Sequence, residues 1–269
     1  MAFPAFFHLI AWGQTSALAL ICFTLMFFLL RDRREFLAGL LLGCLIFKPQ
    51  LGLAAAVVFV SVGAGRVVAG AMLSAAVQLS LALLYYGAEP LRRWIGILWN
   101  ARTQLSLLEP KLYQTHSLRT FWSMLLPWHD LAFVLYIACA ALTLGLTVAI
   151  WKRKVTPLSL RYSSLLLATV LIAPHLTVYD LVILAPAILL IADWLVGQQL
   201  DRSTGLMGIL LYLIYGLPLV GPLALWTHLQ LSVVAMAAMV YMIWKVAPGS
   251  AFALSTASGI EKERVGGDA

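Results

Sequence analysis

Six polar residues of this apolar chain are candidates for binding or catalysis: Gln14, Lys48, Gln50, His175, Tyr179 and Asp180. The last three place an imidazole, a phenol and a carboxylate in one short stretch, and such groups can bind a phosphate or a hydroxyl group, or transfer a proton. Lys48 lies in the middle of a long apolar run, where an ammonium group is costly unless it reaches an interface or has a partner. It is therefore either a cation that holds a phosphate at the membrane boundary or a lysine that extends from a helix end to the interface.

His175 and Asp180 also have structural alternatives. His175 follows Pro174, which breaks a helix, and it lies four residues from Tyr179, a spacing that puts both on one face of a helix. It could equally be an interfacial histidine whose ring nitrogens bond to the backbone. Thr177-x-x-Asp180 has the spacing of a capping box, which does not exclude a carboxylate that faces a cavity. We find no metal-ligand pattern, glycine-rich phosphate loop or Ser-His-Asp arrangement, so no metal or other cofactor is expected.

The composition predicts an integral membrane protein. Of 269 residues, 62% are hydrophobic and 11% are charged, whereas a soluble domain carries about 25% charge. The net charge of +7 comes from short basic tracts between apolar runs. This pattern follows the positive-inside rule and does not indicate nucleic-acid binding, so membrane lipids are the expected surroundings.

The apolar runs predict an all-α, polytopic protein with about seven full spans and a re-entrant helical hairpin. Residues 1–12 are expected to form an interfacial helix or the end of a longer helix. The expected spans cover residues 15–30, 67–86, 131–151, 160–172, 178–196, 205–226 and 229–245. We expect one membrane domain over residues 1–246 and a disordered cytoplasmic tail over residues 247–269.

The hairpin follows from the positions of the basic tracts. If residues 36–62 crossed the membrane once, Arg66 and the cluster 152–154 would lie outside, against the positive-inside rule. If they form two short helices that turn at Lys48-Pro49, these tracts and residues 31–34 all become cytoplasmic. Such broken helices occur at membrane depth where they are buried in protein or line a wet cavity. The loop 87–130 is then outside, and residues 89–102 have the apolar spacing, basic residues and tryptophans of an interfacial helix, or of a plain covering helix.

Three motifs in this order resemble glycosyltransferase family 87, the alpha-mannosyltransferase-like branch of the C-type glycosyltransferases. They are Gly13-Gln14 at the start of a span, Ala38-Gly39-Leu40-Leu41-Leu42-Gly43 leading into Phe47-Lys48-Pro49-Gln50, and Ala173-Pro174-His175 with Tyr179-Asp180. The resemblance implies a multi-pass enzyme of the bacterial plasma membrane. Such an enzyme moves a sugar, typically mannose, from a polyprenyl-phosphate donor to a lipid-linked or envelope glycan on the outer side.

The resemblance also implies roles for individual residues. Lys48 and His175 would hold the donor phosphate, and Gln14, Gln50, Tyr179 and Asp180 would line the same cavity. Members of this family are expected to carry a catalytic carboxylate before the Gly-Gln motif, and no acidic residue precedes Gly13. We therefore expect that this stretch alone does not transfer sugar and leave its catalytic base unassigned. The alternatives are a membrane transporter and a non-catalytic remnant that binds polyprenyl phosphate.

Overall fold

The computed structural model describes residues 3–99, 112–220 and 223–246. This part of the chain is helical and contains no strand, as the apolar runs predicted. The elements of the N-terminal half are α1 (Pro4–Trp12), α2 (Ser16–Arg31), α3 (Glu35–Cys44), η1 (Leu45–Phe47), α4 (Pro49–Ser61), α5 (Gly65–Tyr86) and α6 (Ala88–Trp99). Those of the C-terminal half are η2 (Leu112–Gln114), α8 (Leu118–Leu125), α9 (His129–Lys152), α10 (Leu158–Ile172), η3 (Val178–Leu184), α11 (Ala185–Val196), α12 (Arg202–Gly216), η4 (Leu217–Val220), α13 (Leu223–Thr227) and α14 (Leu231–Val246).

The segment expected to form a hairpin is indeed broken in the middle. Its two arms are α3, with 10 residues, and α4, with 13 residues, and η1 and Lys48 lie between them. At 1.5 Å per residue these helices are about 15 and 20 Å long, shorter than the hydrocarbon core of a bilayer. The break is therefore a structural fact, and the position of its tip within a membrane stays a prediction.

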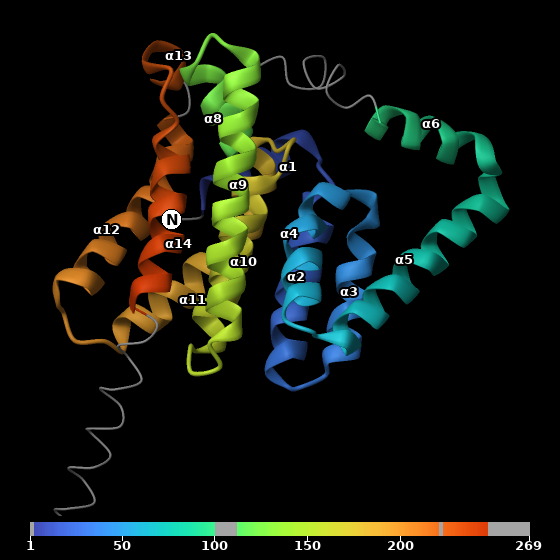
Figure 1. Ribbon diagram of the computed structural model, residues 1–269, viewed down its shortest axis with the longest axis horizontal. Helices are drawn as coiled ribbons and strands as arrows, with labels where there is room; N and C mark the ends of the chain where they lie inside the picture. Colours follow the sequence, from blue (N-terminus) through green and yellow to red (C-terminus); the bar gives the residue numbers. More distant parts are fainter. Residues whose placement is uncertain (1–2, 100–111, 221–222, 247–269) are drawn as a thin grey trace, which may run out of the picture.

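The first arm packs closely against α5, and the two helices run in parallel. A Cβ atom on Gly39 would lie 2.1 Å from the Val67 carbonyl oxygen, and one on Gly43 would lie 2.3 Å from the Ala71 carbonyl oxygen. Small residues four apart allow this approach of two helix backbones, as in membrane helix pairs. Because α3 and α5 are parallel, both begin at the same end of the molecule (Figure 1). Arg33 and Arg34 directly precede α3, and Arg66 is the second residue of α5.

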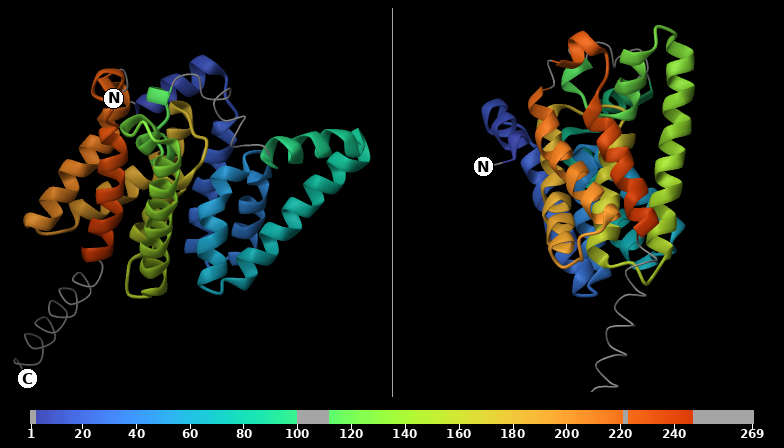
Figure 2. Two further views of the ribbon diagram at one scale, coloured as in Figure 1. Left: turned by 45° about the horizontal axis from the view of Figure 1, so that its top comes forward. Right: turned by 90° about the vertical axis from the view of Figure 1, so that its left-hand side faces the viewer.

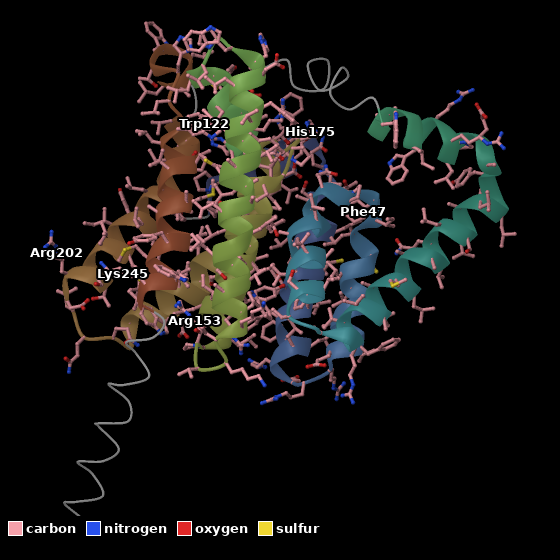
Figure 3. All side chains as sticks on the ribbon, in the orientation of Figure 1. Phe47, Trp122, Arg153, His175, Arg202 and Lys245 are labelled. Carbon is pink, nitrogen blue, oxygen red and sulfur yellow. The ribbon has the colours of Figure 1, made fainter. Side chains whose placement is uncertain are left out.

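A polar hollow at this end brings several basic tracts together. It has a volume of about 800 Å³, and its lining includes Glu35, Arg66, Lys152, Lys154 and Arg161. Arg153 lies at this end too, and His175 lies toward the opposite end (Figure 3). The topology prediction placed these tracts on one side, and the structure brings them to one end of the fold.

Four helical segments in the described ranges are long and apolar enough to cross a membrane: Gly65–Tyr86, His129–Lys152, Val178–Val196 and Arg202–Val220. The other three expected spans correspond to α2, α10 and α14, which are shorter apolar helices. The expected span 205–226 is not one straight helix, because α12 ends at Gly216 and η4 and α13 follow. Pro218, which has no backbone N–H group, lies in η4 and disfavours continuation of the α-helix.

The C-terminal half forms most of the packed core, in which α10 is buried along nearly its whole length between α4, α9, α11 and α14. By contrast, α5 and α6 lead away from this body as an arm in the views of Figures 1 and 2. A helix is present at the expected place as α6, although the last residues of the predicted range lie outside the described ranges. Its interfacial position stays a prediction. The predicted tail from residue 247 lies outside them as well.

Candidate functional site

Lys48 lies at the tip of the hairpin because of its sequence neighbour. Pro49 occupies the first position of α4, where a missing N–H group costs nothing. Proline also disfavours helical geometry in the residue before it, and Lys48 has the non-helical angles φ −136° and ψ 69°. The chain therefore turns at Lys48, and the lysine side chain reaches from the tip toward α2 and η3.

Asp180 joins three segments of the chain through its two carboxylate oxygens. Oδ1 accepts hydrogen bonds from Ser16 Oγ and from Lys48 Nζ, the latter at 2.8 Å. Oδ2 accepts from the backbone N–H and the hydroxyl group of Thr177, at 3.2 and 3.1 Å. The predicted capping box is confirmed, since Thr177 and Asp180 bond reciprocally at the start of η3. A carboxylate has about four acceptor positions, so Asp180 is saturated and poorly placed to remove a proton from a substrate.

The partner of Lys48 is a residue of the protein itself. The sequence argument predicted that water and a bound anion would surround this ammonium group. In the structure its partner is the carboxylate of Asp180, and the exposed fractions of the two side chains are 16% for Lys48 and 3% for Asp180. Lys48 also donates to Ser16 Oγ at 2.9 Å and lies 5.1 Å from the ring centre of Tyr179. An ammonium group has three N–H donors, and the carboxylate and the hydroxyl group account for two of them.

His175 lies beside this ion pair, in the break between α10 and η3. Two side chains, one from α8 and one from α9, bind the backbone at this break. Arg119 Nε donates to the Pro174 carbonyl, and Tyr136 Oη donates to the Ile172 carbonyl at 2.7 Å. Burial lowers the pKa of His175, Asp180 opposes this shift, and the nearby Arg119 and Lys48 cations add to it. The imidazole is therefore neutral at physiological pH and can offer one N–H donor.

Of the six candidates, the structure brings four together and leaves two aside. Lys48, Tyr179 and Asp180 are in contact, and His175 is within their electrostatic reach. Gln14 donates to the Trp12 carbonyl, and no hydrogen bond between described residues joins Gln14 or Gln50 to Lys48 or Asp180. Gln14 is nonetheless close in sequence to Ser16 of the site. Gly13 ends α1 in the left-handed conformation, and α2 begins at Ser16.

Sequence reasoning missed two residues of this site, Ser16 and Arg119. Ser16 is fully buried at the start of α2, and its place just after the Gly-Gln motif was the available signal. Arg119 carried no such signal, because it comes from α8, far from the other members in the chain. The hydrogen bond from Arg119 to Pro174 could be found only once α8 had been placed against the break.

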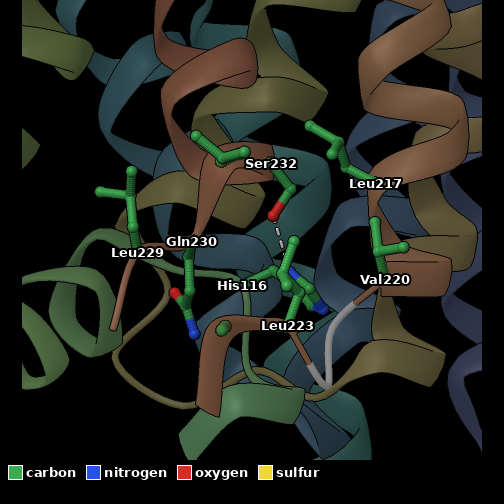
Figure 4. Close-up of a pocket in the computed structure, with 9 residues that line it drawn as sticks. His116, Leu217, Val220, Leu223, Leu229, Gln230 and Ser232 are labelled. Atoms are coloured by element: carbon green, nitrogen blue, oxygen red, sulfur yellow. Dashed lines mark hydrogen bonds between the residues drawn. The ribbon is translucent and has the colours of Figure 1, made fainter. Parts of the chain in front are cut away.

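A second buried polar cluster lies beneath η4 and α13 (Figure 4). His116 Nδ1 and Ser232 Oγ are 2.8 Å apart, and Gln230 donates to the Leu112 carbonyl at 3.0 Å. Burial, with a smaller contribution from the His8 charge, lowers the pKa of His116 to about 4. The remaining ring nitrogen, Nε2, has no hydrogen-bond partner within the described part of the chain. This cluster fixes the start of α8 and hence the position of Arg119.

Fold and site together define a helical membrane protein with a buried ion pair at the tip of a broken hairpin. The sequence pattern of glycosyltransferase family 87 matches residues 1–178. The chain belongs to this family, as the three sequence motifs indicated, and it is therefore a membrane glycosyltransferase by family. The matched range includes Lys48 and His175 and ends just before Tyr179 and Asp180. No significant match was found among curated proteins or among solved structures.

Proposed function

We propose that this chain forms the donor site of a glycosyltransferase that uses a polyprenyl-phosphate sugar on the outer side of a bacterial plasma membrane. The family membership supports transfer of a sugar within a membrane. The observation that carries the proposal is the position of Lys48 and His175, which lie together at the end of the fold away from the basic tracts. The proposed sugar is mannose, and the proposed acceptor is a lipid-linked or envelope glycan.

The donor phosphate would be bound by N–H groups from two sides. Lys48 has a donor left beyond those given to Asp180 and Ser16, and the neutral imidazole of His175 beside it carries one N–H group. Hydrogen bonds from a charged donor to phosphate are the stronger kind. When the sugar leaves, negative charge grows on the phosphate, and a fixed cation beside it stabilises that state more than the ground state.

Asp180 would serve this site by position and not as a base. Its oxygens hold Lys48, Ser16 and Thr177, so it fixes the lysine in the geometry that a phosphate requires. It also offsets the charge of Lys48 when the site is empty. A phosphate would therefore bind to an ion pair with almost no net charge. Its affinity would depend more on the geometry of the hydrogen bonds than on long-range electrostatic attraction.

Binding of polyprenyl phosphate to the purified protein in detergent tests the proposal. Lys48→Ala is expected to lower the affinity at least about tenfold, because a charge-assisted hydrogen bond contributes about 1.5–3 kcal/mol. Lys48→Arg keeps the charge but changes the geometry, so it is expected to retain part of the affinity. The matched control is Lys154→Ala, which removes an exposed lysine at the other end.

The thermal unfolding midpoint of each variant shows whether the fold survives. If folded Lys48→Ala binds polyprenyl phosphate as tightly as the parent, the proposed donor site is wrong. If Lys154→Ala weakens binding as much as Lys48→Ala does, the loss comes from a nonspecific effect of positive charge, and the proposed site is wrong.

A further inference from the structure

The polar hollow at the end of the fold with the basic tracts lies between the two halves of the chain. The first half contributes the turn before α5 and the start of that helix, and the second half contributes the end of α9 and the start of α10. The charged side chains in its lining are four cations, Arg66, Lys152, Lys154 and Arg161, and one carboxylate, Glu35. Positive charge is therefore in excess around this hollow.

The protein does not neutralise these four cations itself. None of them forms an ion pair with a carboxylate in the described part of the chain. The guanidinium carbon of Arg161 lies 5.5 Å from the ring centre of Trp151, and Arg33 adds another positive charge close to it. Trp151 is held in turn by Phe59, since their ring centres are 5.0 Å apart. A half-buried arginine that is held on an aromatic ring without a counter-charge is suited to bind an external anion.

The start of α5 adds backbone donors to the same wall. Residues 63–67 all line the hollow, and the N-cap residue Ala64 makes no side-chain hydrogen bond to the first turn. The first N–H groups of a helix have no partner within it, and they carry the positive end of its dipole. A Cβ atom on Gly63 or Gly65 would meet no neighbouring element within 4 Å, so space lies open beside this helix start. Such a helix start suits a phosphate group.

The rest of the lining indicates what carries the anionic group. It is largely apolar and includes Leu30, Phe59, Val62 and Trp151. Free phosphate would leave these side chains in contact with water, whereas a phospholipid has a phosphate for the cations and acyl chains for the apolar residues. Basic pockets between helices on the cytoplasmic side of membrane proteins bind anionic lipid headgroups. In the predicted topology the basic tracts place this end on the cytoplasmic side.

We propose that this hollow binds one anionic phospholipid of the cytoplasmic leaflet, such as phosphatidylglycerol, through its phosphate group. The phosphate lies between Arg161 and the start of α5, and an acyl chain packs against Leu30 and Val62. Because α5 follows the hairpin and α10 belongs to the packed core, the bound phosphate joins the two halves of the chain at this end. The site is separate from Lys48 and Asp180 and does not depend on the proposed donor site.

Equilibrium titration of the purified protein in detergent with a fluorescent phosphatidylglycerol measures this binding. Arg161→Gln is expected to weaken it at least about tenfold, as the loss of a charge-assisted hydrogen bond does. Gly65→Asp is expected to weaken it to a similar extent, because the new carboxylate takes the position of the anion at a helix start, where it also favours the helix. Phosphatidylcholine, whose headgroup has no net charge, should bind the parent more weakly than phosphatidylglycerol.

Two matched controls separate this site from general effects. Gly65→Asn adds a side chain of the size of aspartate without its charge, and Arg202→Gln removes an exposed arginine that does not line the hollow (Figure 3). Both are expected to bind phosphatidylglycerol as the parent does. The thermal unfolding midpoint of each variant without added lipid shows whether it is folded. Gly65→Asp is the deciding variant if Arg161→Gln does not fold.

A loss of affinity in Arg161→Gln and Gly65→Asp, with both controls unchanged, supports the proposal. Unchanged affinity in the folded hollow variants overturns it, as does equal binding of phosphatidylglycerol and phosphatidylcholine by the parent. An equal loss in Arg202→Gln would show a general effect of surface charge, and an equal loss in Gly65→Asn would show a steric effect, so either result overturns the proposed site. If inorganic phosphate binds as tightly as phosphatidylglycerol and displaces it, the hollow takes a free anion and the lipid assignment is wrong.

Discussion

At the residue scale, the ion pair between Lys48 and Asp180 determines how the site is built. Both side chains are largely buried, and a buried pair contributes little net stability compared with two apolar residues. Its effect is instead to fix three segments, the start of α2, the tip of the hairpin and the start of η3, in one arrangement. Removal of one partner leaves the other charge buried without compensation.

We expect Asp180→Asn to lower the free energy of unfolding by roughly 3–5 kcal/mol, because Lys48 keeps its charge in a site with little water. Adding Lys48→Met should recover part of this loss, since the two residues are coupled and their effects are not additive. Thermal unfolding of the purified protein in detergent measures both. Asp193→Asn, at an exposed position, is the control and should change stability by less than about 0.5 kcal/mol. Equal stabilities of Asp180→Asn and the parent would contradict the proposed importance of the pair.

The sequence predicted the composition of this site better than its internal bonding. Lys48 and His175 stood out because a charged or titratable group in an apolar run needs a partner, and Thr177-x-x-Asp180 gave the capping box. The identity of the partner was not predictable, because nothing in the local spacing relates Lys48 to a carboxylate 132 positions away. The sequence argument predicted that a bound ligand supplies the negative charge opposite Lys48. In the structure that charge comes from Asp180 of η3.

At the element scale, the contact between α3 and α5 holds the hairpin in place. Gly39 and Gly43 on α3 approach the carbonyl groups of Val67 and Ala71 on α5. The approach leaves no room for a side chain between the two helix backbones. Glycine at these positions is therefore required by packing.

Gly39→Ala is expected to destabilise the protein by about 1–3 kcal/mol, because its methyl group would lie 2.1 Å from a backbone oxygen that cannot move freely. Gly52→Ala is the matched control in the other arm, where the added methyl group has ordinary contacts. It should be neutral or slightly stabilising, since alanine favours the helix. The difference between the two thermal midpoints is the measurement, and a difference of zero would refute the role of close packing.

The elements themselves were largely predictable from the pattern of apolar runs and breaks. Pro49 and Pro174 identified two breaks, because proline removes a donor and restricts the residue before it. The break after Gly216 was missed, although Pro218 was visible, because the surrounding run is uniformly apolar and its length suggested one span. The glycine contacts could not be predicted either, since their spacing does not reveal which helix approaches them.

At the scale of the whole molecule, the parallel course of α3 and α5 has a direct consequence for topology. Since both helices begin at the end that carries Arg66, Lys152 and Lys154, the positive-inside rule places this end in the cytoplasm. The arm of α5 and α6 then reaches the outer side. In this topology, which stays a prediction, the short helices of the hairpin would return to the side from which they entered.

Cysteine labelling in intact cells tests this arrangement. In a background without Cys22, Cys44 and Cys139, a cysteine at Arg66 or Lys154 should react with a membrane-impermeant maleimide only after the membrane is opened. A cysteine at Glu89, at the exposed start of α6, should react in intact cells. External labelling at Arg66 would require residues 36–62 to cross the membrane once and would exclude the hairpin.

The long sequence separation of Lys48 and Asp180 bears on how the protein is made. During synthesis, Lys48 leaves the ribosome 132 residues before the carboxylate that will neutralise it. Until η3 emerges, the tip of the hairpin holds an ammonium group with no permanent counter-charge, at a cost of about 3 kcal/mol if it lies deep in the bilayer. The nascent hairpin must therefore wait near the aqueous boundary or beside the insertion machinery. We therefore expect the hairpin to reach its final position late in biogenesis, after the second half of the chain has been made.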